Sequence, residues 1–115
     1  MDNRSQDQRQ VRNFIGGEWI AAKETMKAIN PATGETIASL PKSGADEVNQ
    51  AVAAAKAARA WAQVPVFQRA ATCVAIASAI DAHRDRLART LSLDQGRILK
   101  ESTGEWTTAA DGFHI

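Results

Sequence analysis

The residues best suited to nucleophilic or metal chemistry are one cysteine, Cys73, and two histidines, His83 and His114. Cys73 falls in the middle of a helical pattern, on its apolar stripe, where no helix N-terminus or neighbouring cation would stabilise a thiolate. We therefore expect a buried structural cysteine. The alternative is a self-sufficient enzyme that uses Cys73 as its nucleophile. The two histidines are too far apart in sequence to form a helical metal pair, so each is expected at or near the surface.

Glycine-rich and serine-containing catalytic motifs are absent from the sequence. Neither G-x-G-x-x-G nor G-x-x-x-x-G-K-[ST] occurs, which removes the two common phosphate-binding loops. There is also no G-x-S-x-G elbow of the kind that presents a hydrolase serine. The 115 residues therefore hold no complete active site, and their role has to be inferred from the elements they build.

Charge and composition exclude several classes of function. The 14 basic and 13 acidic residues nearly cancel, without the clustered Lys and Arg of a nucleic-acid footprint. No apolar run reaches the roughly 20 residues of a membrane span, and the N-terminus lacks the apolar centre of a secretory signal. A single cysteine cannot form an internal disulfide, which fits a reducing compartment. We expect a soluble cytoplasmic protein with no nucleic-acid or membrane partner.

Two β-hairpins are predicted after a disordered tail at residues 1–12. The first hairpin turns at Gly16-Gly17, because a Gly-Gly pair supplies the positive φ angles of a two-residue turn. The second pairs residues 27–30 with 35–40 around Pro31-Ala32-Thr33-Gly34, a sequence that suits a type I turn.

Three to four helices follow the hairpins. Apolar spacing predicts helices over 45–62, capped by Ser43 or Asp46, over 66–82 and over 84–94. Gly96 is placed to end the third helix in a left-handed cap. A fourth helical pattern begins near residue 100, interrupted by the weak helix formers Ser102-Thr103-Gly104, and stops at Ile115 without a cap. We expect this end to be a truncation.

The order of these segments resembles the N-terminal region of NAD(P)-dependent aldehyde dehydrogenases. The resemblance runs through F-I-G-G-E-W-I (14–20), I-N-P-A-T-G-E-T-I-A-S-L-P (29–41), D-E-V-N-Q-A-V-A-A-A-K-A-A (46–58), Trp61, Arg69 and L-D-Q-G-R (93–97), with Glu101 and Glu105. The family often has lysine in place of Arg97, and a smaller aliphatic residue in place of Trp106. The resemblance implies an α/β parent fold with a Rossmann-type cofactor domain. Residues 13–115 would be the N-terminal part of that domain, cut before its parallel sheet and the catalytic domain.

The resemblance also implies the function of the parent enzyme, which oxidises an aldehyde to a carboxylic acid with NAD or NADP and assembles as a dimer or tetramer. The family's catalytic cysteine, general base and cofactor-binding residues lie downstream, and Cys73 matches none of them. No catalytic or cofactor-binding residue is therefore expected here, and the segment alone should be inactive, its main partner being the missing remainder of the chain. The alternative is a small helical interaction module that docks on full-length relatives.

One site of the family carries over to this segment. Some members hold a structural monovalent cation, K+ or Na+, between backbone carbonyls before the N-P pair and an acidic side chain in the L-D-x-G turn. The matching positions are Ala28 or Ile29 and Asp94. Carboxylate and carbonyl oxygens are the hard ligands that such a cation prefers. The alternative is that Asp94 only caps the turn before Gly96.

Overall fold

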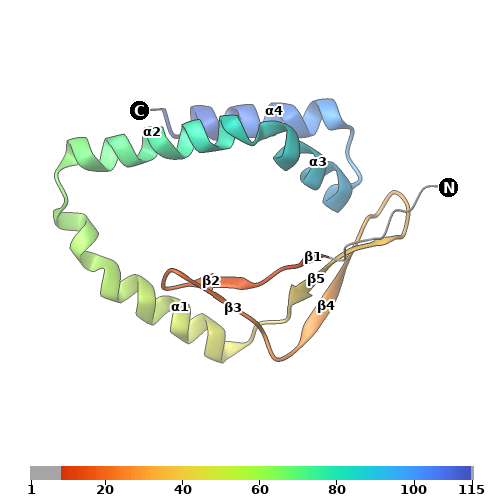
Figure 1. Ribbon diagram of the computed structural model, residues 1–115, viewed down its shortest axis with the longest axis horizontal. Coiled ribbons are helices and arrows are strands. Elements are labelled where there is room, and N and C mark those ends of the chain that lie inside the picture. Colours follow the sequence, from red (N-terminus) through yellow and green to blue (C-terminus); the bar gives the residue numbers. More distant parts are fainter. Residues whose placement is uncertain (1–8, 115) are drawn as a thin grey trace. The chain divides into compact units, whose positions relative to one another are not determined.

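The computed structural model describes residues 9–114, and its contacts divide the chain into two units (Figure 1). The first unit holds residues 9–30 and 34–59, which form the strands and the first helix. The second holds the turn residues 31–33 together with residues 60–114, which form the remaining helices. Each unit is described by itself. No helix within residues 9–114 is both long and apolar enough to cross a membrane.

Two small sheets make up the β part of the first unit. A two-stranded antiparallel sheet joins β2 (Asn13–Ile15) to β3 (Glu18–Ile20). A three-stranded sheet has the order β1-β5-β4, from Arg9–Gln10, Thr36–Pro41 and Thr25–Ile29. β4 and β5 are antiparallel. Both predicted hairpins are therefore confirmed.

Glycine geometry explains why both hairpins close where the sequence predicts. Gly16 and Gly17 have φ angles of 62° and 89°, the left-handed region that a Gly-Gly hairpin turn requires. Gly34, at φ 76°, closes the second turn by donating its N–H to the carbonyl of Asn30 at 2.8 Å. The closing bond spans five residues, so the loop is one residue longer than an isolated type I turn.

The expected disorder over residues 1–12 is wrong for its last part. Arg9–Gln10 form β1, which pairs in parallel with β5 through Arg9 with Ala38 and Gln10 with Ser39. The N–H of Val11 extends the ladder to the carbonyl of Ser39 at 2.9 Å. The partner strand is distant in sequence, so no local pattern reveals this pairing. Residues 1–8 lie outside the described part of the chain.

Helix α1 (Ala45–Ala57) starts from Gly44 rather than from Ser43 or Asp46. The backbone N–H of Gly44 donates to Oε2 of Glu47 at 2.7 Å, which satisfies one end of a capping box. Ser43 instead accepts a hydrogen bond from the side-chain amide of Asn13 at 2.7 Å. The helix is also shorter than predicted, because residues 58–63 continue as a 3-10 helix.

Three helices form the second unit: α2 (Val66–Ala82), α3 (Arg84–Gln95) and α4 (Leu99–Asp111). The bounds of α2 are those that the sequence predicts. α4 packs against both α2 and α3, and it runs beside α2 in Figure 1. Gly96 ends α3 with φ 67°, the predicted left-handed cap.

Small residues line the places where these helices meet. Ala77 of α2, Ala88 of α3, and Ser102 and Ala110 of α4 are each at most 1% exposed. The hydroxyl groups of Ser92 and Ser102 hydrogen bond at 2.9 Å within this interface. Ser102-Thr103-Gly104 is therefore helical despite its weak propensity, because a small side chain lets α4 approach its neighbours closely.

The buried apolar core of residues 9–114 is made only of alanine, namely Ala28, Ala77, Ala88 and Ala110. Large apolar side chains lie on the surface instead: Phe67 is 84% exposed, Trp19 66% and Ile98 63%. Fully burying a large aliphatic or aromatic side chain contributes about 1.5–3 kcal/mol, whereas alanine contributes far less. The two units thus expose the residues that would give a domain of this length most of its stability.

Candidate functional site

Cys73 lies near the middle of α2, seven residues after the first residue of the helix, and is half-buried. The first turn of α2, where the helix N-terminus stabilises negative charge, therefore lies well before Cys73. The position fits the structural role that the sequence predicts, although the side chain is less buried than expected.

The two histidines are exposed, as expected, and do not form a metal site. His83 stands at the junction of α2 and α3, and His114 follows the end of α4. Within residues 9–114 no group of three or more His, Cys, Asp or Glu side chains could hold a metal ion.

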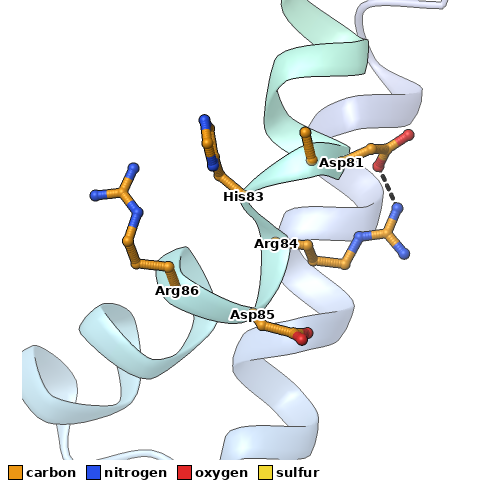
Figure 2. A pocket seen from close by; sticks show the side chains of 6 residues that line it. Asp81, His83, Arg84, Asp85 and Arg86 are labelled. Atoms are coloured by element: carbon orange, nitrogen blue, oxygen red, sulfur yellow. Dashed lines mark hydrogen bonds and ion pairs between the residues drawn. The ribbon is translucent and has the colours of Figure 1, made fainter.

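The α2–α3 junction forms a shallow pocket of about 360 Å³ (Figure 2). Its lining is almost entirely charged or polar: Asp81, Ala82, His83, Arg84, Asp85 and Arg86. Figure 2 shows Arg84 turned toward Asp81, with which it forms an ion pair, whereas His83 and Arg86 extend to another side of the chain. Acidic and basic side chains alternate here, and the aspartates and His83 are exposed, which is typical of a solvated charged surface.

The turn between α3 and α4 brings together residues that the sequence treats separately. Arg97 forms an ion pair with Glu105, and its Nε lies 3.6 Å from Oε2 of Glu101. The hydrogen bond with Glu105 raises the pKa of Arg97 above its ordinary value, with a smaller contribution from Glu101. One guanidinium thus links the turn to two successive turns of α4.

Gly96, in the same turn, lies against the tip of the β4–β5 hairpin. A Cβ placed on Gly96 would lie 3.0 Å from Cγ of Pro31 and 3.3 Å from the backbone nitrogen of Ala32. Contacts of 3.0–3.4 Å are tighter than nine in ten real Cβ contacts, so Pro31 and Ala32 would have to shift by a few tenths of an ångström. The position therefore favours glycine both for its positive φ and for the contact, and only the first preference is visible in the sequence.

The candidate cation ligands lie on β4 and α3. Ala28 is 8% exposed and pairs with Ala38, whereas Ile29 is 52% exposed and pairs with Thr36. The register shifts between Ala28 and Ile29, where the pairing skips Ile37 of β5. Asp94 is exposed in the last turn of α3.

Comparison with known proteins places these features in a family. The family model described as "Aldehyde dehydrogenase family" matches residues 19–115. Malonate-semialdehyde dehydrogenase 3 of Geobacillus kaustophilus is 41% identical over 98 residues, which cover 83% of this chain and 20% of the relative. Malonate-semialdehyde dehydrogenase of Bacillus cereus is 39% identical over 100 residues, covering 84% and 21%. The chain thus spans about a fifth of the length of the curated relatives it matches.

Solved structures of aldehyde dehydrogenases contain a similar segment. The NAD-dependent aldehyde dehydrogenase of Sinorhizobium meliloti superposes with a TM-score of 0.89 at 27% identity, over 98% of this chain and 24% of that one. Betaine aldehyde dehydrogenase of Staphylococcus aureus, in complex with NAD+, gives a TM-score of 0.86 at 32% identity, over 90% and 22%. The segment of strands and helices is therefore a recurring part of much longer chains.

Proposed function

The chain belongs to the aldehyde dehydrogenase family, and from this premise we propose that it serves as the N-terminal part of the cofactor-binding domain of an NAD- or NADP-dependent enzyme. The complete enzyme would oxidise an aldehyde to a carboxylic acid. The observation that carries the proposal is the unequal coverage: the match takes in 83% of this chain but only 20% of a relative that is 41% identical.

The distribution of apolar residues supports the same proposal independently of the comparisons. The described residues bury alanine and expose Phe67, Trp19 and Ile98. A segment that buries alanine and leaves its large apolar side chains exposed lacks the buried apolar area that stabilises a domain of this length, which fits a part of a larger fold. In the proposed enzyme, the remainder of the same polypeptide would complete that fold.

We place the chemistry of the reaction outside residues 9–114. In this class of oxidation a thiolate adds to the aldehyde carbonyl, hydride leaves the adduct, and water hydrolyses the resulting thioester. The nicotinamide supplies the hydride acceptor. Cys73 is half-buried in the middle of α2 and has no activating neighbour among the residues described above. This segment would therefore act as scaffold, holding helices and hairpins against the domain that binds the cofactor.

An activity assay tests the proposal. The full-length enzyme, purified from its native source, is expected to form NADH or NADPH when an aldehyde is supplied. Malonate semialdehyde and betaine aldehyde, the substrates in the relatives' names, are the first to try. The 115-residue chain alone should be inactive with both cofactors. Turnover by the short chain would refute the assignment of scaffold.

The carbonyl of Ala28 or Ile29 and the carboxylate of Asp94 are proposed as ligands of a structural K+ or Na+ in the complete enzyme. The register shift between Ala28 and Ile29 supports this by marking an irregular stretch of backbone at these positions, and carbonyl and carboxylate oxygens are ligands that such a cation prefers. The test compares thermal melting in potassium chloride and in tetramethylammonium chloride. A higher melting temperature in potassium, lost in Asp94→Asn, is expected; equal melting temperatures in both salts would rule out the cation.

Assembly and location complete the proposal. We infer a homo-oligomer, a dimer or tetramer, in the cytoplasm, by analogy with the family. Sedimentation of the full-length enzyme tests the first statement, because a monomer at micromolar concentration would contradict it. Fractionation of the source cells tests the second.

A further inference from the structure

The turn between α3 and α4 is held by its backbone at both ends. On the α3 side, the N–H of Gly96 donates to the carbonyl of Ser92 at 2.9 Å. On the α4 side, the carbonyl of Ile98 accepts the N–H of Glu101 at 3.1 Å. Arg97 stands between these two bonds, and its side chain adds a third attachment.

That third attachment is ionic and is made to α4. The guanidinium of Arg97 pairs with Glu105, and its Nε lies 3.6 Å from Oε2 of Glu101. The two glutamates are four residues apart, so they follow one face of α4 over about 6 Å of its axis. A planar guanidinium has enough donors to bind both carboxylates at once. We call these three residues the ion-pair latch.

The tip of the β4–β5 hairpin lies against the turn that the ion-pair latch holds. The contacts of residues 31–33 assign this tip to the helical unit, although residues 30 and 34 belong to the other unit. A Cβ on Gly96 would lie 3.0 Å from Cγ of Pro31 and 3.3 Å from the backbone nitrogen of Ala32. Because atoms packed this closely leave no slack, a displacement of the turn acts directly on the tip.

We propose that the ion-pair latch is a salt-sensitive device that controls the opening of the hairpin tip. While the guanidinium binds both glutamates, the turn stays in place and the tip remains closed. The three side chains are between 34% and 56% exposed, so dissolved salt screens their attraction and loosens the turn. Such a latch goes beyond the scaffold role proposed above, since it makes the hold on one hairpin adjustable.

Hydrogen exchange in the full-length enzyme, followed by mass spectrometry, tests the proposal. The peptide over residues 29–36 reports the tip, where the N–H of Gly34 donates to the carbonyl of Asn30 at 2.8 Å. The peptide over residues 92–98 reports the turn through the N–H of Gly96. Arg97→Gln and Glu105→Gln are compared with the parent at roughly 0.01 M salt, where the Debye length is about 30 Å, and at about 1 M, where it is roughly 3 Å.

Two further variants serve as controls. Glu24→Gln removes an exposed ion pair with Lys42, 3.3 Å long, from the open end of the same hairpin. It should leave exchange at the tip unchanged. Arg97→Lys keeps the charge but not the planar fork, so it should give a smaller increase than Arg97→Gln. It also provides a milder break of the ion-pair latch if Arg97→Gln does not fold.

At low salt, Arg97→Gln and Glu105→Gln should each speed exchange about two- to five-fold in both peptides, the range expected for loss of an exposed ion pair. The double variant should add little, because both changes break the same interaction. At high salt the parent should exchange as fast as the variants. Faster exchange at 92–98 without any change at 29–36 would overturn the proposal, because the ion pairs would then stabilise α4 alone. An equal increase at the tip in Glu24→Gln, or a parent insensitive to salt, would overturn it as well.

Discussion

Replacing Gly96 by alanine should destabilise the full-length enzyme more than the same change at Gly34, although both glycines have positive φ. Their φ angles are 67° and 76°, so each alanine incurs the left-handed penalty of roughly 1–2 kcal/mol. The surroundings differ: a Cβ on Gly34 meets nothing within 4 Å, whereas one on Gly96 lies 3.0 Å from Cγ of Pro31.

The extra cost at Gly96 comes from crowding. Overpacking a close contact typically costs about 1–3 kcal/mol. Gly96→Ala should therefore lose about 2–5 kcal/mol and Gly34→Ala about 1–2 kcal/mol. A Cβ on Gly96 would also lie 3.3 Å from the backbone nitrogen of Ala32, so relieving the contact requires a shift of the hairpin tip and not of the Pro31 ring alone.

The assay is thermal melting of the two variants and the parent, combined with hydrogen exchange over residues 29–36 and 92–98. Gly96→Ala should lower the melting temperature more and increase exchange in both segments, whereas Gly34→Ala should affect the hairpin alone. A double variant with Pro31→Ala provides the control, since removing Cγ should recover part of the loss at Gly96 but none at Gly34. Equal losses for the two glycines, or no recovery with Pro31→Ala, would refute the argument.

Three further substitutions test separate parts of the structure. The indole N–H of Trp106 is buried and has no hydrogen-bond partner among residues 9–114, so Trp106→Phe should leave stability unchanged or raise it by about 1 kcal/mol in chemical denaturation; a clear loss would contradict this. Ser102 is fully buried against Ser92, so Ser102→Leu should cost about 1–3 kcal/mol, and a neutral outcome would contradict the close packing of α3 on α4. The hydrogen bond from the Gly44 backbone lowers the pKa of Glu47, so its stabilising effect is complete above the unfolded-state pKa and is lost as pH falls through the lower folded-state value. Glu47→Gln should therefore melt at a lower temperature than the parent near neutral pH and at a similar one in acid; parallel melting curves against pH would contradict this.

The predictable parts of the fold are those with a local cause. Gly16-Gly17 requires a turn wherever it occurs between two strands, and Pro65 stops one helix and starts the next, so the hairpin and the bounds of α2 follow from neighbouring residues. The start of α1 at Gly44 could also have been predicted from the sequence, because Glu47 follows Gly44 by three residues, the spacing of a capping box.

Distant partners account for what the sequence does not reveal. Arg9 and Gln10 become a strand because β5 offers them an edge about 29 residues later, and Ser102 is helical although a weak helix former, since it is fully buried where α4 packs on its neighbours. The same holds for the turn after α3. Arg97 and Glu105 are eight residues apart, and the tip at Pro31 meets Gly96 from a far earlier part of the chain. Patterns of local spacing carry no record of such contacts.

For catalysis, the sequence shows only which residues are poor candidates, namely Cys73 and the two histidines. Cys73 sits on the middle of a helix, and the histidines lie apart at the surface, so neither the sequence nor the described structure assembles a reacting group. The order of several segments along the chain, rather than any single motif, carries the resemblance to the family.

The intact mass of the gene product, purified from its native source, tests most directly whether this segment works as part of a larger enzyme. We predict a mass several-fold above the 12.4 kDa of the 115 residues, together with aldehyde-dependent reduction of NAD or NADP in the same fraction. A folded product of 12.4 kDa would contradict it, because the exposed apolar surface would then have to be covered by another protein.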